Sequence, residues 1–282
     1  MKELFITSIY SNLYGTDLGG RPSRSGHYKW SLLNILNLKP LKVVCFTSTE
    51  EIDELKAWFY VEHHVNPELL EFREFDLRES KHYDKIQANK DIDKVKNGDR
   101  CHEIQYNKFF WAELIEDRHD YDRIYWIDAG LSHGGLFPEE YQLGDKWESH
   151  FSIIMFRQKV LKMWNKQSKD KILIMAKNNT DRYYWSRTLP DRFYKEYNND
   201  KHIIGGMFGC TPKKYDDLAA TFENYLLTIL DKSDELYHEE NIMCCMYVDD
   251  MESYNTLDFD DWYERPEWKQ YDPILFHHLF VI

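Results

Sequence analysis

The stretch Tyr121-Asp-Arg-Ile-Tyr-Trp-Ile-Asp-Ala-Gly130 contains a short apolar run that ends on an acid followed by two small residues. The run Arg-Ile-Tyr-Trp-Ile has the length and the aromatic and β-branched content of a buried strand. A strand that stops at Asp128 puts a carboxylate at the carboxyl rim of a sheet, where open α/β folds bind ligands. Ala129 and Gly130 would let a ligand approach the backbone closely. Equally, Asp128 could cap a turn before Gly130.

Apolar runs of strand length alternate with helical periodicities along most of the chain. The expected strands are residues 4–10, 42–47, 69–77, 122–128, 151–156, 171–176 and 202–209. The expected helices are residues 28–38, 50–63, 107–117 and 215–230, with a further helix that starts near residue 239. This alternation predicts an α/β fold with a mainly parallel sheet flanked by helices. Since no repeat or linker divides the pattern, we expect a single domain.

Two polar segments interrupt this alternation. Residues 11–26 contain several glycines and are too long for a simple turn, and loops that follow a strand in such folds commonly carry ligands. Residues 78–100 are charged and lack apolar runs, so they predict an exposed helix or a mobile insertion. Thr49 precedes the helix expected at residues 50–63 and is placed to act as its N-cap.

Composition narrows the class of protein. The 282 residues carry a net charge of −13, which argues against broad nucleic-acid binding because duplex affinity rests on Lys and Arg neutralising phosphates. Five irregularly spaced cysteines do not suit a secreted disulfide framework or a zinc site. The first residues lack a signal-peptide pattern, and no run approaches the roughly 20 apolar residues of a membrane span. We therefore expect a cytoplasmic protein.

Several short motifs follow one another in a characteristic order. They are Ile6-Thr-Ser-Ile-Tyr10, Arg24-Ser-Gly-His-Tyr28, Cys45-Phe-Thr-Ser48, Tyr106-Asn-Lys-Phe109, Trp126-Ile-Asp-Ala-Gly130, Gly205-Gly-Met-Phe-Gly209 and Glu239-Glu-Asn-Ile-Met243. Together they resemble the GT-A glycosyltransferases and, more closely, the bacterial HtrL/YibB (WlaTC-like) family. The resemblance implies a GT-A, Rossmann-like sheet in one domain, with a donor-binding half at about residues 1–135 and an acceptor or catalytic half at about residues 136–282.

The resemblance also implies a set of donor-binding residues. They are Thr7, Ser8, Tyr10, Arg24, Lys108, Asp128, Ala129, Gly130, Gly205 and Gly206. Lys108 would lie on a helix before the donor strand and offset phosphate or uracil oxygens, unless it is a solvated helix lysine. Arg24 could reach a diphosphate from the long loop or pair with a surface acid. Gly205 and Gly206 would let a sugar approach the backbone, or they mark a bulged strand.

One position departs from the general GT-A pattern. The usual Asp-x-Asp motif, which holds a divalent metal against the donor diphosphate, is reduced to Asp128-Ala-Gly130. Asp128 would either share a metal, most readily Mn²⁺, with ligands from elsewhere or bind the ribose instead. His133 and the pair His277-His278 are candidate helpers, because Mn²⁺ accepts imidazole with carboxylate ligands. The expected metal ligands are Asp128 and His278, although a lone histidine is more often a surface or hydrogen-bonded residue.

Glu239 and Glu240 are the candidate catalytic residues. Acids in a first helical turn are favoured by the helix dipole whatever the function. The resemblance places this acidic turn in the sugar site, where a carboxylate could deprotonate an acceptor hydroxyl or orient the donor sugar. Of the two, Glu240 is slightly favoured.

The leading hypothesis is transfer of a hexose from a nucleotide sugar, UDP-linked by expectation, to a hydroxyl of a glycan or glycolipid acceptor in surface polysaccharide or lipo-oligosaccharide synthesis. Such an enzyme would work in the cytoplasm, with peripheral contact at the inner face of a membrane left open. A nucleotidyltransferase is one alternative, since Gly19-Gly-Arg21 partly matches the loop that such enzymes carry after their first strand. A non-catalytic carbohydrate-binding protein is another, motivated by the missing second aspartate.

Overall fold

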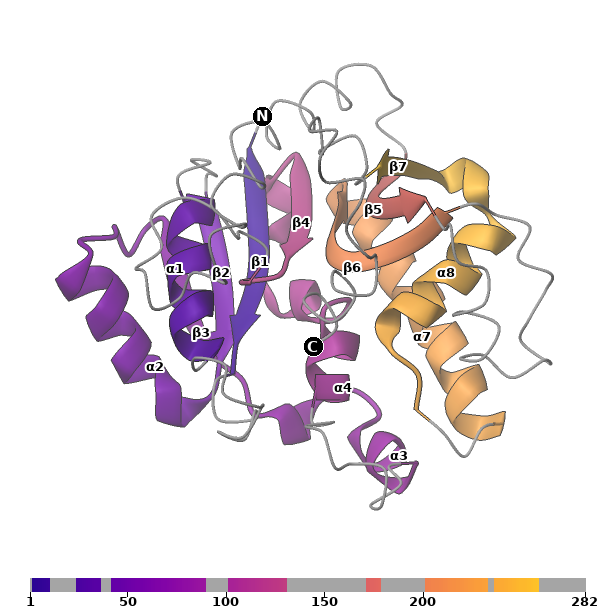
Figure 1. Ribbon diagram of the computed structural model, residues 1–282, viewed down its shortest axis with the longest axis horizontal. Helices are drawn as coiled ribbons and strands as arrows, with labels where there is room; N and C mark the ends of the chain where they lie inside the picture. Colours follow the sequence, from indigo (N-terminus) through magenta and orange to yellow (C-terminus); the bar gives the residue numbers. More distant parts are fainter. Residues whose placement is uncertain are drawn as a thin grey trace, which may run out of the picture.

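The described part of the chain folds around one seven-stranded sheet in the computed structural model (Figure 1). The structure describes residues 2–10, 24–36, 42–89, 101–130, 171–178, 201–232 and 236–258. The strands are β1 (Glu3–Ile9), β2 (Lys42–Thr47), β3 (Leu70–Glu74), β4 (Arg123–Ile127), β5 (Ile172–Asn178), β6 (Lys201–Cys210) and β7 (Tyr254–Asp258). They lie in the order β3-β2-β1-β4-β6-β5-β7.

Most neighbouring strands run parallel, and β6 is the exception. The pairs β1–β2, β2–β3, β1–β4 and β5–β7 are parallel, whereas β6 is antiparallel to both β4 and β5. The prediction of an α/β fold with a mainly parallel sheet is confirmed. From β1 the chain proceeds outward to β2 and β3 and then returns to place β4 on the other side of β1. The direction of strand addition therefore reverses between β1 and β4.

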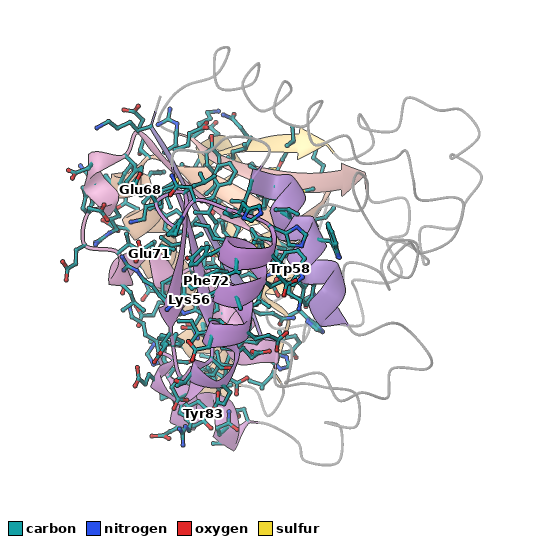
Figure 2. The ribbon with its side chains drawn as sticks, turned by 90° about the vertical axis from the view of Figure 1, so that its left-hand side faces the viewer. Lys56, Trp58, Glu68, Glu71, Phe72 and Tyr83 are labelled. Carbon is teal, nitrogen blue, oxygen red and sulfur yellow. The ribbon has the colours of Figure 1, made fainter. Side chains whose placement is uncertain are left out.

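Helices cover both faces of the sheet. One face packs against α1 (Arg24–Leu36), α2 (Thr49–Lys56) and the π-helix η2 (Ala57–Glu62). The other face packs against α3 (Tyr83–Ala88), α4 (Cys101–Asn107), α7 (Pro212–Lys232) and α8 (Glu239–Asp249). The short 3-10 helices are η3 (Leu77–Glu79), η5 (Trp111–Leu114), η6 (Arg118–Asp120) and η8 (Met251–Ser253). Figure 2 shows the α2 side, with Lys56 and Trp58 on the helical layer and Phe72 on β3.

Strand β4 is apolar because both of its faces are covered. Ile124 and Trp126 belong to the core on the α7 side, whereas Tyr125 and Ile127 belong to the core on the α2 side. A strand buried on both faces reads as a continuous apolar run rather than an alternation. This explains why β4 was recognisable from the sequence. Because residues two apart on a strand point to the same face, Asp128 points to the same side of the sheet as Trp126.

The long helix α7 shows the periodicity expected of a helix with one buried face. Leu218, Phe222, Leu226 and Ile229 recur every three or four residues and are all buried. Phe222 stacks on Phe109, with ring centroids 3.7 Å apart. Burial of each such side chain is worth roughly 1.5–3 kcal/mol, so this face holds α7 on the sheet. Within the described ranges, no helix combines the length and the apolar composition that crossing a bilayer requires.

The prediction of a helix at residues 107–117 is wrong. Helix α4 ends at Asn107, residues 108–110 form a turn, and the 3-10 helix η5 follows. Three consecutive aromatic side chains, Phe109, Phe110 and Trp111, are all buried. All three join the core on the α7 side, so the aromatic run marks burial and not a continuous helix.

Other boundaries also differ from the sequence-based expectations. The helix expected at residues 50–63 is α2 followed by the π-helix η2, and Ser48, not Thr49, occupies its N-cap position. Helix α1 begins at Arg24, which was expected in a loop. Strand β7 was not predicted. The strand expected at residues 151–156 lies outside the described residues.

Candidate active site

Asp128 lies directly after the last residue of β4, beside the carboxyl end of β1. Its backbone N–H donates to the carbonyl of Gly206 at 2.8 Å, which anchors it to β6. The indole Nε1 of Trp126 donates to its Oδ1 at 2.8 Å. Its side chain remains 30% exposed. The carboxylate is thus oriented by its own strand and still reaches solvent at the rim of the sheet.

Lys108 brings a positive charge to this carboxylate from the turn after α4. Its Nζ lies 3.1 Å from Asp128 Oδ1 and 2.6 Å from Glu239 Oε1. The hydroxyl of Tyr215 donates to the Lys108 carbonyl at 2.7 Å, which fixes the backbone of the turn to α7. The ammonium also lies 5.6 Å from the centroid of the Trp126 ring, a favourable position for a cation. Lys108 is 5% exposed, so it is not the solvated helix lysine considered above.

The first turn of α8 supplies two acids with different surroundings. Glu239 is buried against Lys108 and also approaches Gly205, where a Cβ atom would lie only 2.5 Å from its Oε1. Glu240 is partly exposed, and its Oε1 accepts the backbone N–H of Gly205 at 2.8 Å. Gly205 therefore meets both acids, one through the space a side chain would occupy and one through its amide. Glycine is needed here for close approach.

Burial raises the pKa of Asp128 to about 6; Lys108 acts in the opposite direction, and Glu239 adds to the rise. Burial by itself would lower the pKa of Lys108, but Asp128 and Glu239 outweigh it, so this pKa lies above its ordinary value. Lys108 is therefore positively charged at neutral pH. Among the described residues, the cluster including Glu240 has three carboxyl groups for one ammonium, which suits hydrogen bonds from sugar or ribose hydroxyls better than contact with bare phosphates.

The structure brings together six residues that the sequence had singled out. They are Lys108, Asp128, Gly205, Gly206, Glu239 and Glu240. They come from four segments, and the contact between Lys108 and Glu239 spans 131 positions of sequence.

Three other predicted site residues lie in the last part of β1 or directly after it. Thr7 is fully buried on the strand, Ser8 is partly exposed, and Tyr10 is 4% exposed. The Tyr10 hydroxyl donates to the Phe75 carbonyl at 3.0 Å, and burial raises the pKa of this phenol above its ordinary value. Its hydrogen-bonding group is thus used inside the protein. Their role in donor binding stays a prediction.

The remaining predicted residues are placed only in part. Ala129 is buried on the α2 side, and Gly130 lies in the turn after Asp128. The backbone of Arg24 is helical, at the first position of α1. His133, His277 and His278 lie outside the described residues.

The described residues by themselves do not fit a divalent metal. Among them, no group of three His, Cys, Asp or Glu side chains could hold an ion. The carboxylates of Asp128 and Glu239 both contact the ammonium of Lys108. A binding site for Mn²⁺ needs several oxygen or nitrogen ligands and not a fixed cation beside them.

Trp126 and Tyr215 were not singled out from the sequence as site residues. The contact from Trp126 could have been found, because residues two apart on a strand share a face and Trp126 precedes Asp128 by two. The contribution of Tyr215 could not, since its hydrogen bond to Lys108 spans 107 positions.

No protein-family model matches this sequence, and no curated protein sequence matches it. Among solved structures, the chain is similar to galactosyltransferase LgtC in complex with donor and acceptor sugar analogs, at 8% identity and a TM-score of 0.47, covering 86% of this chain and 70% of that one. It is also similar to 4-diphosphocytidyl-2C-methyl-D-erythritol synthase from Anaerococcus prevotii, at 11% identity and a TM-score of 0.48, covering 96% of each chain. With such values, these similarities carry no argument about activity.

Proposed function

We propose that this protein is a GT-A-type glycosyltransferase that moves a hexose from a UDP-sugar to a hydroxyl of a glycan or glycolipid. The observation that carries the proposal is the place of Asp128. It follows β4 beside the end of β1, where the direction of strand addition reverses. Open α/β sheets bind their ligands outside the carboxyl ends of the strands at such a reversal. Ser8 near the end of β1 and Asp128 directly after β4 both lie at this edge of the sheet.

The chemistry of the cluster supports transfer to a hydroxyl. Asp128 is oriented to accept hydrogen bonds from ribose or sugar hydroxyls. Glu240 is partly exposed and tethered to the Gly205 amide, so it is the better candidate for a base that takes the proton of the acceptor hydroxyl. Glu239 is joined to Lys108 inside the protein and serves to position the other groups. These roles refine the earlier preference for Glu240.

We propose that this activity serves surface polysaccharide or lipo-oligosaccharide synthesis in the cytoplasm. We also propose that the protein does not bind nucleic acid. The acidic balance of 49 Asp and Glu against 36 Lys and Arg supports the last point. Mn²⁺ with Asp128 and His278 as ligands was an expectation from the family resemblance; His278 lies outside the described residues, and no step above depends on a metal.

Thermal stabilisation of the protein by UDP, a panel of UDP-sugars, nucleoside triphosphates and glycans tests the proposal, together with slow hydrolysis of the UDP-sugars. We expect UDP and one UDP-sugar to raise the melting temperature and that sugar to be hydrolysed. A response to a nucleoside triphosphate alone would indicate a nucleotidyltransferase. A response to glycans without any nucleotide effect would indicate a binding protein.

The substitution Asp128→Ala locates the site. It removes the oriented carboxylate, so we expect donor binding to be lost while the far-UV circular dichroism is kept. Asp122→Ala is the matched control, because Asp122 is an exposed aspartate at the opposite end of the same strand. Unchanged UDP affinity in Asp128→Ala would show that the nucleotide binds elsewhere.

A further inference from the structure

The ammonium of Lys108 is surrounded by oxygen atoms from three sides of the site. Nζ lies 2.6 Å from Glu239 Oε1, 3.1 Å from Asp128 Oδ1 and 3.4 Å from the Gly205 carbonyl oxygen. A lysine ammonium has three N–H donors, so three oxygen atoms match its capacity. Both Lys108 and Glu239 are almost fully buried, at 5% and 4% exposure. This is a cation built into the protein, not a surface charge that a ligand could easily displace.

A divalent cation would compete with this ammonium for the same oxygens. Ions such as Mg²⁺ and Ca²⁺ take carboxylate oxygens at about 2.0–2.6 Å. An ion on Asp128 Oδ1 or Glu239 Oε1 would therefore lie close to Nζ, and like charges repel strongly in a water-poor site. The aromatic face of Trp126 adds a further preference for the ammonium where it is.

We infer that Lys108 takes the part that a bound metal would otherwise play, holding Asp128 and Glu239 in position, so that nucleotide-sugar binding at this site does not require a divalent cation. Lys108 is a positioning residue in this view, and it does not itself contact the substrate. The statement about nucleotide sugars rests on the proposed function. The statement about the carboxylates and the ammonium does not.

Calorimetric titration of UDP into the wild-type protein tests the first statement, once in EDTA and once in excess Mn²⁺. We expect the same affinity in both. Lys108→Arg, which keeps a cation, is expected to retain UDP binding that is insensitive to EDTA. Binding that disappears in EDTA and returns with Mn²⁺ would overturn the inference.

Mn²⁺ alone, followed by electron paramagnetic resonance without nucleotide, tests the second statement. Lys108→Ala leaves two carboxylates without a compensating charge, so we expect it to bind Mn²⁺ on the order of tenfold more tightly than the wild type. Adding Asp128→Asn to this variant should abolish the gain. Lys85→Ala is the matched control, because Lys85 pairs with Asp231 at the surface, with side chains 50% and 59% exposed. No gain in Lys108→Ala would overturn the inference.

The two arms separate the possible failures. If the wild type binds no UDP but Lys108→Ala gains Mn²⁺, the proposed function fails and the role of Lys108 stands. If circular dichroism shows that Lys108→Ala does not fold, Mn²⁺ binding to the wild type decides. Binding that Asp128→Asn removes would overturn the inference, and the absence of such binding supports it.

Discussion

A single oxygen of Asp128, Oδ1, accepts the hydrogen bond from the indole of Trp126 and also forms the ion pair with the ammonium of Lys108. Both contacts favour the ionised carboxylate, yet its partial burial and the nearby charge of Glu239 outweigh them, and the pKa of Asp128 is raised to about 6. The side chain is therefore charged at neutral pH and becomes protonated in mildly acidic solution. A protonated carboxyl has less capacity to accept hydrogen bonds from a sugar.

This pKa predicts a pH dependence of donor binding. We expect affinity for a UDP-sugar to be constant above about pH 7 and to fall as the pH drops through 6, because the accepting carboxylate is lost. Asp128→Asn should bind weakly with no such dependence. Calorimetric titration between pH 5 and 8 checks this, using a UDP-sugar because its diphosphate does not titrate in that range. A flat wild-type profile would contradict the role of Asp128.

The contribution of Asp128 to folding stability changes with pH in the opposite direction to its contribution to donor binding. The pKa of Asp128 in the folded protein is above the ordinary value of 3.8, so folding favours the protonated form. The stability that this group contributes is fully present below about pH 3.8 and is lost as the pH rises through 6. Weaker binding in acid would therefore not be caused by a loss of this group's contribution to stability.

Residues at strand ends could be predicted, and their partners could not. Asp128 was identified because an apolar run stops on an acid, a local pattern in ten residues. Lys108 and Glu239 were named only through a family resemblance, and nothing in the sequence indicates that they touch across 131 positions. Such a contact depends on the packing of α4, β6 and α8, which local periodicity does not encode.

Strand β6 connects the candidate site with the middle of the sheet, and two of its glycines are needed for different reasons. At Gly205 a Cβ atom would collide with the Glu239 carboxylate. At Gly209 it would collide with the Tyr125 ring and lie 2.5 Å from the Ile124 carbonyl oxygen, both on β4. The first glycine makes room for a functional side chain, and the second makes room for the neighbouring strand.

The substitutions Gly205→Ala and Gly209→Ala should therefore have different effects. Gly205→Ala displaces Glu239 from Lys108, so we expect weaker UDP-sugar binding. Gly209→Ala forces β4 and β6 apart and should cost about 1–3 kcal/mol of unfolding free energy, with binding retained in the folded fraction. Urea denaturation and calorimetric titration of both variants check this. Equal binding by Gly205→Ala and the wild type would show that the position of Glu239 does not matter for the donor.

Elements with a clean periodicity were predicted correctly, and elements without one were missed. Helix α7 has its apolar residues on one face, and β4 is apolar throughout. By contrast, β7 has one buried aliphatic side chain, Leu257, so it gives almost no signal. Its pairing with β5 comes from the fold around it. Residues 107–117 were misassigned because consecutive aromatics do not show which backbone can bury them.

The sheet continues through both predicted halves of the chain. Strands β1 to β4 come from the first half and β5 to β7 from the second, and they are joined where β6 pairs with β4. Figure 1 shows β1 and β4 in the middle of the molecule, with helices on either side. The candidate site lies at this junction, so neither half contains all of it.

Hydrogen exchange should reflect this arrangement. We expect the slowest amide exchange in the central strands β1 and β4, which are paired on both sides, and faster exchange in β3 and β7 at the ends of the sheet. Mass spectrometry of peptic fragments over minutes to hours checks this order. Early exchange in β4 would show that the junction opens before the edges.

The pairing of β4 with the later strand β6 joins parts of the site that a ribosome synthesises far apart in time. Asp128 and Glu239 are separated by 111 positions. At a translation rate of about 5–20 residues per second, roughly 6 to 22 s pass between their synthesis. During that interval Lys108 and Asp128 exist without Glu239, and β4 has no neighbour on the β6 side until residues 201–210 have been made. The growing chain thus carries an unprotected edge on β4, of the kind that chaperones shield, until β6 has been synthesised.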